Sequence, residues 1–184
     1  MPNKHSPHAA FQTRWAKTAD IPAIHAVMMA AIDQLQADFL SDEQIKASHQ
    51  IMGLDTQLID DETYLLVECE GVLAGCGGWS KRATLYGGDH SLDLRDPELL
   101  DPGRDPAKVR AMYTHPDWVR RGVGRIVLQE CEKAAAQNGF TQVELMATMS
   151  GKPLYQSCGY SIVEEVEADA SGTAIPLARM AKGL

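Results

Sequence analysis

Hydrophobic positions recur at helical spacing between residues 20 and 53. The first helix is predicted to begin at Asp20, with Pro22 in its first turn. One face of this helix would carry the apolar residues Ile24, Val27, Met28, Ala31 and Leu35. Ser41 and Gln44 have the spacing of a capping box, so a second helix is expected to begin at Ser41 and to end near Gly53.

Short apolar runs bounded by turn residues predict the strands. These runs cover residues 11–17, 63–69, 72–79, 109–114, 143–147, 160–168 and 174–180. Two further helices are expected over residues 123–138 and 153–157, because Gly139 and Gly159 are suited to end them. Six or seven strands with about four helices and no internal repeat indicate a mixed α/β or α+β fold.

Two stretches depart from this regular pattern. Gly75, Gly77 and Gly78 lie inside one predicted strand, where glycine usually marks a bulge or the close approach of another backbone or a ligand. Residues 81–106 are rich in Gly, Asp and Pro, and loops of this length are usually functional or disordered.

Composition and charge narrow the class of protein. The chain has 184 residues, which fits a single domain over residues 1–184. Its formal net charge of -8 argues against nucleic-acid binding, which needs a cationic face. No targeting segment or long apolar run is present, so we expect a soluble cytoplasmic protein that does not bind membranes. None of the four cysteines forms a C-x-x-C pair, which favours reduced core thiols over a metal site or disulfides.

The main candidate for chemistry is the turn at residues 119–125. It follows a predicted strand and precedes an amphipathic helix, whose N-terminal N–H groups and positive dipole end attract phosphate. Gly122 and Gly124 would let the backbone approach a ligand, while Arg120, Arg121 and Arg125 add positive charge. The spacing matches neither the P-loop nor the dinucleotide-binding motif. A pyrophosphate site is favoured over a loop with solvated arginines.

Three motifs in order resemble the GNAT superfamily of acyl-CoA-dependent N-acyltransferases. Residues 114–125 are similar to its signature (Q/R)-x-x-G-x-(G/A), with Val119 where the family prefers Gln or Arg. Residues 153–160 are similar to its F-Y-x-x-x-G-F/Y segment, and residues 14–22 resemble its common opening. The resemblance implies a mixed, mostly antiparallel sheet of six or seven strands, splayed at its centre and flanked by about four helices.

The resemblance also implies a site for acetyl-CoA between the strands near residues 112–114 and 143–147. Tyr155 occupies the position of the family's catalytic tyrosine, whose hydroxyl can protonate the departing thiolate. Thr148 stands where many members have an asparagine that contacts the cofactor. The expected cofactor-binding residues are Met112, Tyr113, Thr114, Arg120, Arg121, Gly122, Val123, Gly124, Arg125 and Thr148. No metal is expected.

On the acceptor side, the length and position of the loop over residues 81–106 predict that it forms a flap. We expect a primary amine of a small molecule or peptide, attacking directly in a ternary complex, with a non-catalytic acyl-CoA-binding module as the alternative. Dimers are common in the family, so a homodimer is a further expectation. Arg110 would either meet a substrate carboxylate or form a surface ion pair. Structural roles are favoured over acceptor contact for Glu68, Trp79, Tyr86, His90 and His115, and a solvated surface for residues 60–62.

Overall fold

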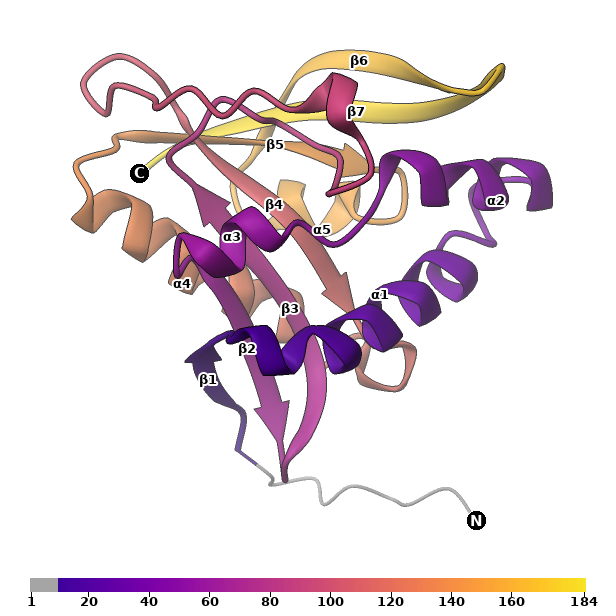
Figure 1. Ribbon diagram of the computed structural model, residues 1–184, viewed down its shortest axis with the longest axis horizontal. Helices are drawn as coiled ribbons and strands as arrows, with labels where there is room; N and C mark the ends of the chain where they lie inside the picture. The colour runs from indigo at the N-terminus through magenta and orange to yellow at the C-terminus, as the bar shows by residue number, and fades with distance from the viewer. Residues whose placement is uncertain (1–9) are drawn as a thin grey trace.

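A single seven-stranded sheet forms the centre of the protein (Figure 1). The computed structural model describes residues 10–184. The strand order is β1-β2-β3-β4-β5-β7-β6, and every neighbouring pair is antiparallel except β4 and β5. The strands are β1 (Gln12–Trp15), β2 (Tyr64–Cys69), β3 (Val72–Ser80), β4 (Ala107–Thr114), β5 (Gln142–Thr148), β6 (Ser161–Ala170) and β7 (Thr173–Gly183). The mixed, mostly antiparallel fold expected from the sequence is confirmed.

Within the described residues, five α-helices flank the sheet, with α1 and α3 on one face and α4 on the other (Figure 1). They are α1 (Ile21–Leu35), α2 (Asp42–Ile51), α3 (Thr56–Asp60), α4 (Val123–Gln137) and α5 (Lys152–Ser157). The capping box is confirmed, since the Gln44 N–H donates to Ser41 Oγ at 3.2 Å and the Ser41 N–H donates to Gln44 Oε1 at 3.1 Å. The short helix α3 was not predicted.

Two details of the first helix differ from the expectation. A 3₁₀ turn over Thr18–Asp20 precedes α1, and the Asp20 carboxylate accepts from the Lys17 N–H and from Arg14 rather than from α1. The buried face of α1 includes Ile32, whereas Leu35 is only partly buried. The final turn of α1 therefore lies at the edge of the core.

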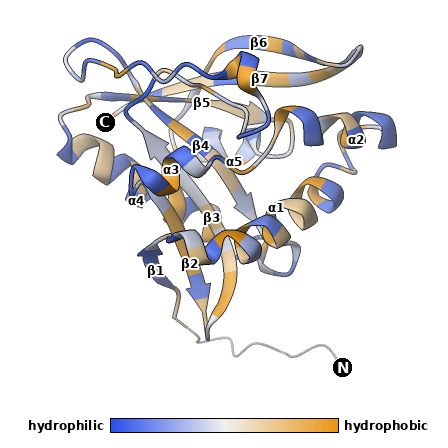
Figure 2. Ribbon diagram, in the orientation of Figure 1, coloured by the Kyte–Doolittle hydropathy of each residue, from blue (hydrophilic) through white to orange (hydrophobic). Residues whose placement is uncertain are grey.

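The core forms on both faces of the sheet. One cluster joins α4 to β3, β4 and β5, and it includes Val127, Leu128 and Leu145. The other joins α1 and α3 to β2 and includes Ile24 and Leu58. In Figure 2 the strands β2 and β3 are largely orange or pale, while the loop between β3 and β4 is largely blue. Burial of these apolar strand faces is the main driving force for this arrangement.

The glycines of β3 allow two neighbouring elements to approach the strand closely. A Cβ on Gly75 would lie 2.5 Å from Val123 Cγ1, at the start of α4. A Cβ on Gly77 would lie 2.6 Å from Met112 Cγ on β4. Both distances are too short for real carbon contacts, so larger residues would push α4 and β4 away from the sheet. The predicted close approach is confirmed, and the element that approaches is protein.

The sheet splays between β4 and β5. These parallel strands pair only at Ala107 with Val143 and at Lys108 with Glu144. A buried ion pair between Lys108 and Glu144 lies at this closed end. Beyond Lys108, the edge of β4 that faces β5 has no strand partner among residues 10–184. The splay predicted by resemblance is present, and it opens a cleft toward the ends of both strands.

The loop over residues 81–106 is tied to the body of the protein by ion pairs. Arg82 bonds Asp61 at 2.7 Å, and Arg95 bonds Asp55 at 2.8 Å and Asp89 at 2.7 Å. Asp61 therefore belongs to an internal contact and not to a solvated charge run. These contacts fix the loop over the face of the sheet on which α3 lies.

The cysteines are free thiols, as expected. Cys69, Cys76 and Cys131 are buried, and Cys158 is partly exposed. Residues 10–184 contain no cluster of three or more His, Cys, Asp or Glu side chains arranged to hold a metal. Over the same residues, no helix has both the length and the apolar character needed to cross a membrane.

Candidate active site

The turn before α4 presents free backbone donors. Gly122 precedes the helix in a left-handed conformation with φ of 87°, and Arg120 also has a positive φ of 63°. The first bond of the helix runs from the Ile126 N–H to the Gly122 carbonyl at 3.0 Å. The N–H groups of residues 120–125 donate to no acceptor within residues 10–184. Such a set of amides at a helix N-terminus attracts anions.

The two glycines of this turn have different roles. A Cβ on Gly122 would meet nothing within 4 Å, so this glycine is required by its left-handed backbone. A Cβ on Gly124 would lie 2.6 Å from Leu154 Cδ2. Gly124 is therefore required by the packing of α5 against α4. The expectation that Gly124 lets the backbone approach a ligand stays a prediction, because the contact with Leu154 concerns the missing Cβ and not the Gly124 N–H.

A large groove of about 960 Å³ runs from this turn through the splay between β4 and β5. The groove is lined by α4 and α5 on one side of the sheet and by α1 on the other. It brings together ten of the predicted site residues, namely Met112, Tyr113, Thr114, Arg120, Gly122, Val123, Gly124, Arg125, Thr148 and Tyr155. Arg121 does not line it, since its guanidinium lies 4.9 Å from the centre of the Trp118 ring.

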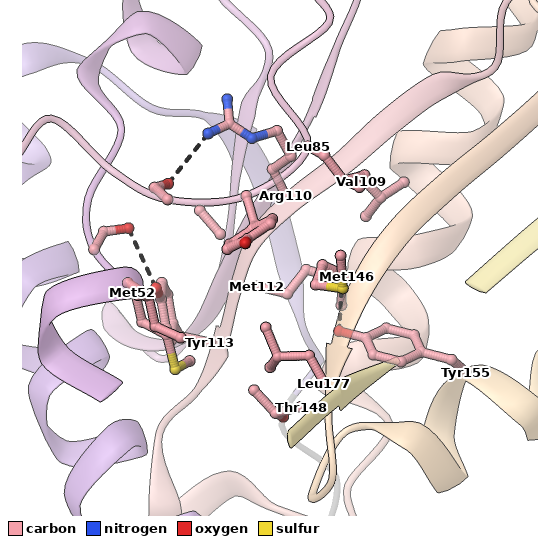
Figure 3. A pocket seen from close by; sticks show the side chains of 15 residues that line it. Met52, Leu85, Val109, Arg110, Met112, Tyr113, Met146, Thr148, Tyr155 and Leu177 are labelled. Atoms are coloured by element: carbon pink, nitrogen blue, oxygen red, sulfur yellow. Dashed lines mark hydrogen bonds between the residues drawn. The ribbon is translucent and has the colours of Figure 1, made fainter. Parts of the chain in front are cut away.

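A second, small pocket of about 90 Å³ continues the groove toward the closed end of the splay (Figure 3). The two share the lining residues Met52, Met112, Tyr113, Thr148 and Tyr155. The outer wall of the small pocket comes from residues 51–53 and from residues 85–87 of the long loop. The loop predicted to be a flap on the acceptor side thus lines this pocket.

Tyr155 lies where the groove and the small pocket meet. Its hydroxyl is 3.8 Å from Met112 Sδ, as the dashed line in Figure 3 shows. Its ring packs edge-on against Tyr160, with the centroids 6.0 Å apart. Burial raises the pKa of the Tyr155 hydroxyl well above that of a free phenol. The hydroxyl therefore stays protonated at neutral pH and can donate a proton or a hydrogen bond.

Thr148 stabilises the turn that leads into α5. The Gly151 N–H donates to Thr148 Oγ1 at 3.2 Å, and the Thr148 and Ser150 hydroxyls lie 3.1 Å apart. Its side chain thus has internal partners while it also lines the groove.

A distortion in β4 lies next to Tyr155. Ala111 has a φ of 50°, a region that residues with a Cβ rarely adopt, and the register with β3 shifts at this point. The buried Tyr64 hydroxyl donates to the Ala111 carbonyl at 2.8 Å, and the Tyr113 hydroxyl donates to the Gly53 carbonyl at 3.2 Å. Sequence reasoning missed Tyr64 and Gly53, because neither residue carries a local signal of contact with β4.

Arg110 is buried and forms an internal ion pair. Its guanidinium contacts the buried carboxylate of Asp55, and it donates to the Gly87 carbonyl at 3.1 Å. Burial lowers the pKa of Arg110, while Asp55 opposes that shift. The expected surface ion pair is wrong, because both partners are almost fully covered. The side chain does line the small pocket, as Figure 3 shows.

The remaining acceptor candidates have structural partners. Glu68 pairs with Arg14 at 2.8 Å, and Trp79 packs edge-on against Phe140. The ring of His115 accepts from the Asp117 N–H at 3.2 Å, which confirms its role in the turn.

Two more of these candidates lie near the long loop. The ring of His90 lies 2.9 Å from the Gln50 carbonyl, whereas Tyr86 lines the small pocket. Asp38 is the one carboxylate among the residues that line either cavity. No protein carboxylate or imidazole therefore lines the small pocket.

Known proteins resemble this chain in sequence pattern and in fold. The family described as "Acetyltransferase (GNAT) family" matches residues 28–160. A GCN5-related N-acetyltransferase structure from Rhodopseudomonas palustris has a TM-score of 0.70 at 22% identity, covering 98% of this chain and 100% of that one. The PaiA N-acetyltransferase of Thermoplasma acidophilum, solved with coenzyme A, has a TM-score of 0.64 at 14% identity, covering 95% and 99%. No curated protein matches the chain.

Proposed function

The chain belongs to the acetyltransferase (GNAT) family, and from this premise we propose that it transfers an acetyl group from acetyl-CoA to a primary amine. The amine is carried by a small molecule or a peptide, and it attacks the thioester directly within a ternary complex. The observation that carries the proposal is the set of unbonded amides at residues 120–125, which opens onto a groove that crosses the splayed sheet.

The residues of the groove fit the parts of acetyl-CoA. The amides of residues 120–125 would hold the pyrophosphate, with Arg120 and Arg125 adding positive charge at the rim. The unpaired edge of β4 at residues 112–114 would bind the pantetheine arm as an added strand does. Acetyl-CoA supplies the activated thioester, which this arrangement would bring next to Tyr155.

The environment of Tyr155 suits a general acid. The new C–N bond forms as the C–S bond breaks, and Tyr155 donates its proton to the departing thiolate. The surplus proton of the nitrogen passes to solvent, from which Tyr155 is reprotonated. A tyrosine at this junction favours the enzyme over a non-catalytic acyl-CoA-binding module.

The cysteines support direct attack over a covalent acyl-enzyme. A thiolate is the nucleophilic form of cysteine, and burial raises the pKa of Cys76 to about 12. Burial also raises the pKa of Cys131. Cys158, which is partly exposed, lines neither cavity. The four thiols therefore offer no nucleophile facing the groove.

Two measurements test the proposal. Acetyl-CoA should raise the Tm of the protein, because a ligand that binds only the folded state stabilises it. Acetyl-CoA should also be consumed, with release of free thiol, when suitable primary amines are supplied. No Tm shift at millimolar acetyl-CoA would refute the groove assignment. A Tm shift without thiol release over a broad amine panel would support the binding module instead.

A further inference from the structure

The small pocket combines apolar side chains with a few polar groups, among them Tyr86, Thr148 and Tyr155. The side chains of Leu85, Val109, Met112, Met146 and Leu177 surround it, and Arg110 is the one charged residue in its lining. Figure 3 shows Arg110 and Tyr155 on opposite sides of the pocket. An ammonium group entering this space would lose water, and it would find no free negative charge there, because Asp55 is already paired with Arg110. Both effects disfavour the charged form of an amine.

The carboxylate behind Arg110 cannot serve an incoming cation. Asp55 is 1% exposed. Its Oδ1 accepts from Arg95 at 2.8 Å and from the Gln57 N–H at 3.0 Å, and its other oxygen contacts Arg110. The negative charge of Asp55 is therefore balanced by Arg95 and Arg110 within the protein. The pocket has no free negative group with which to hold a polyamine or a lysine side chain.

The volume of the pocket limits the size of the group it can hold. About 90 Å³ is available. A cavity of about 150 Å³ lined by aliphatic side chains holds benzene, so this one suits an aliphatic group smaller than a benzene ring. Side chains of the size of alanine or valine fit this limit, whereas tryptophan does not.

We propose that the acceptor is an α-amine beside a small uncharged side chain, and that its nitrogen enters the small pocket in the neutral form. The inference rests on the proposed function and names its substrate class. It explains how a site without a carboxylate or imidazole in this pocket obtains a nucleophile, because the amine loses its proton to solvent before it enters. Polyamines and lysine ε-amines are poor acceptors for the same reason.

The ordinary ionisation of amines gives the size of the effect. An α-amine has a pKa near 7.9 and a lysine ε-amine a pKa near 10.4, so at pH 7.5 about 200 times more of the α-amine is neutral. If only the neutral form enters, kcat/KM should favour the α-amine by about that factor. Even partial entry of the charged form should leave at least a tenfold preference.

The test compares matched acceptors on the wild-type enzyme at saturating acetyl-CoA. One arm uses a lysine-free tripeptide with a free N-terminal alanine, and a second uses alaninamide, which separates peptide from small-molecule substrates. The contrasting arms use an N-terminally blocked tripeptide that contains lysine, and spermidine. A preference of at least tenfold for either alanine compound supports the inference. Equal or faster acetylation of spermidine or of the lysine peptide overturns it.

A pair of variants tests the charge argument inside the pocket. Met146→Glu places a carboxylate in the lining, and Met146→Gln is its uncharged match of equal size. We expect the ratio of spermidine to alaninamide kcat/KM to be at least tenfold higher in Met146→Glu than in Met146→Gln, because the two variants differ mainly in charge. An equal change in both variants would overturn the inference. Tm and acetyl-CoA affinity report whether each variant is folded.

The outcomes also separate this inference from the proposed function. If acetyl-CoA binds and spermidine is the better acceptor, the substrate class is wrong while the acetyltransferase proposal stands. If acetyl-CoA neither binds nor is consumed with any amine, both are wrong.

Discussion

The substitution Gly122→Asp tests the anion site most directly. It adds a carboxylate to the turn whose amides would hold the pyrophosphate, at a position where a Cβ meets no protein atom within 4 Å. At about 6 Å from two phosphate charges, the repulsion is about 1.4 kcal/mol at the dielectric constant of water and about 5.5 kcal/mol at an effective value of 20. We therefore expect acetyl-CoA affinity to fall at least tenfold.

Thermal shift gives a simple measurement of this loss. At a concentration of 100 times Kd, a ligand stabilises the folded state by about 2.7 kcal/mol. For a chain of this size, that corresponds to a Tm increase of about 5–11 °C. A tenfold weaker Kd would reduce the increase at the same concentration to about half. The loss should diminish at high salt, because the added charge is exposed and screened.

The substitution also strains the backbone, so a matched control is needed. Gly172 has a φ of 88° and open space around its missing Cβ, like Gly122, but it lies in the turn between β6 and β7. Gly172→Asp should lower the Tm of the free protein by a similar amount, through left-handed strain of about 1–3 kcal/mol, and keep the full acetyl-CoA shift. Wild-type affinity in Gly122→Asp would refute the pyrophosphate assignment.

Three further predictions concern the groove and the ion pairs around it. Tyr155→Phe should lower kcat about 100-fold or more and leave acetyl-CoA affinity within about twofold, and an unchanged kcat would remove Tyr155 as the acid. Asp55→Ala should leave Arg110 buried without its partner and destabilise the fold by about 3–5 kcal/mol in urea unfolding, whereas Glu165→Ala at its exposed pair with Lys152 should cost less than about 1 kcal/mol. Arg14 lowers the pKa of Asp20 to about 2, so the stability from this pair is present above pH 4 and lost as the pH falls toward 2. Asp20→Asn should therefore make the free energy of unfolding less dependent on pH between about pH 4 and pH 2. An unchanged pH dependence in this variant would contradict the role of the Arg14–Asp20 pair.

Local patterns were sufficient for most of the elements. The capping box at Ser41, the β2–β3 turn and the glycine after α4 each depend on residues close in sequence, and the structure contains all three. Helix α3 was missed because its five residues are too few for an apolar period. The helix begins after Asp55, whose side chain accepts from the Gln57 N–H. A single Asp before a charged segment does not by itself predict the start of a helix.

The two halves of the site differ in how far a sequence can reveal them. The anion site uses consecutive backbone amides at a helix N-terminus, so a short motif around Gly122 contains nearly all of its information. The small pocket instead combines residues 51–53, residues 85–87 and side chains from β4, β5, β7 and α5, which only the tertiary fold brings together.

Arg110 illustrates the difference between local and tertiary information. Its sequence position is that of a strand residue facing a cleft, but its charge is neutralised by Asp55, which lies 55 positions earlier. If each charged residue is interpreted separately, Arg110 is expected to bind an anionic group of the substrate. The pair together indicates a pocket without net charge, and that favours a neutral amine.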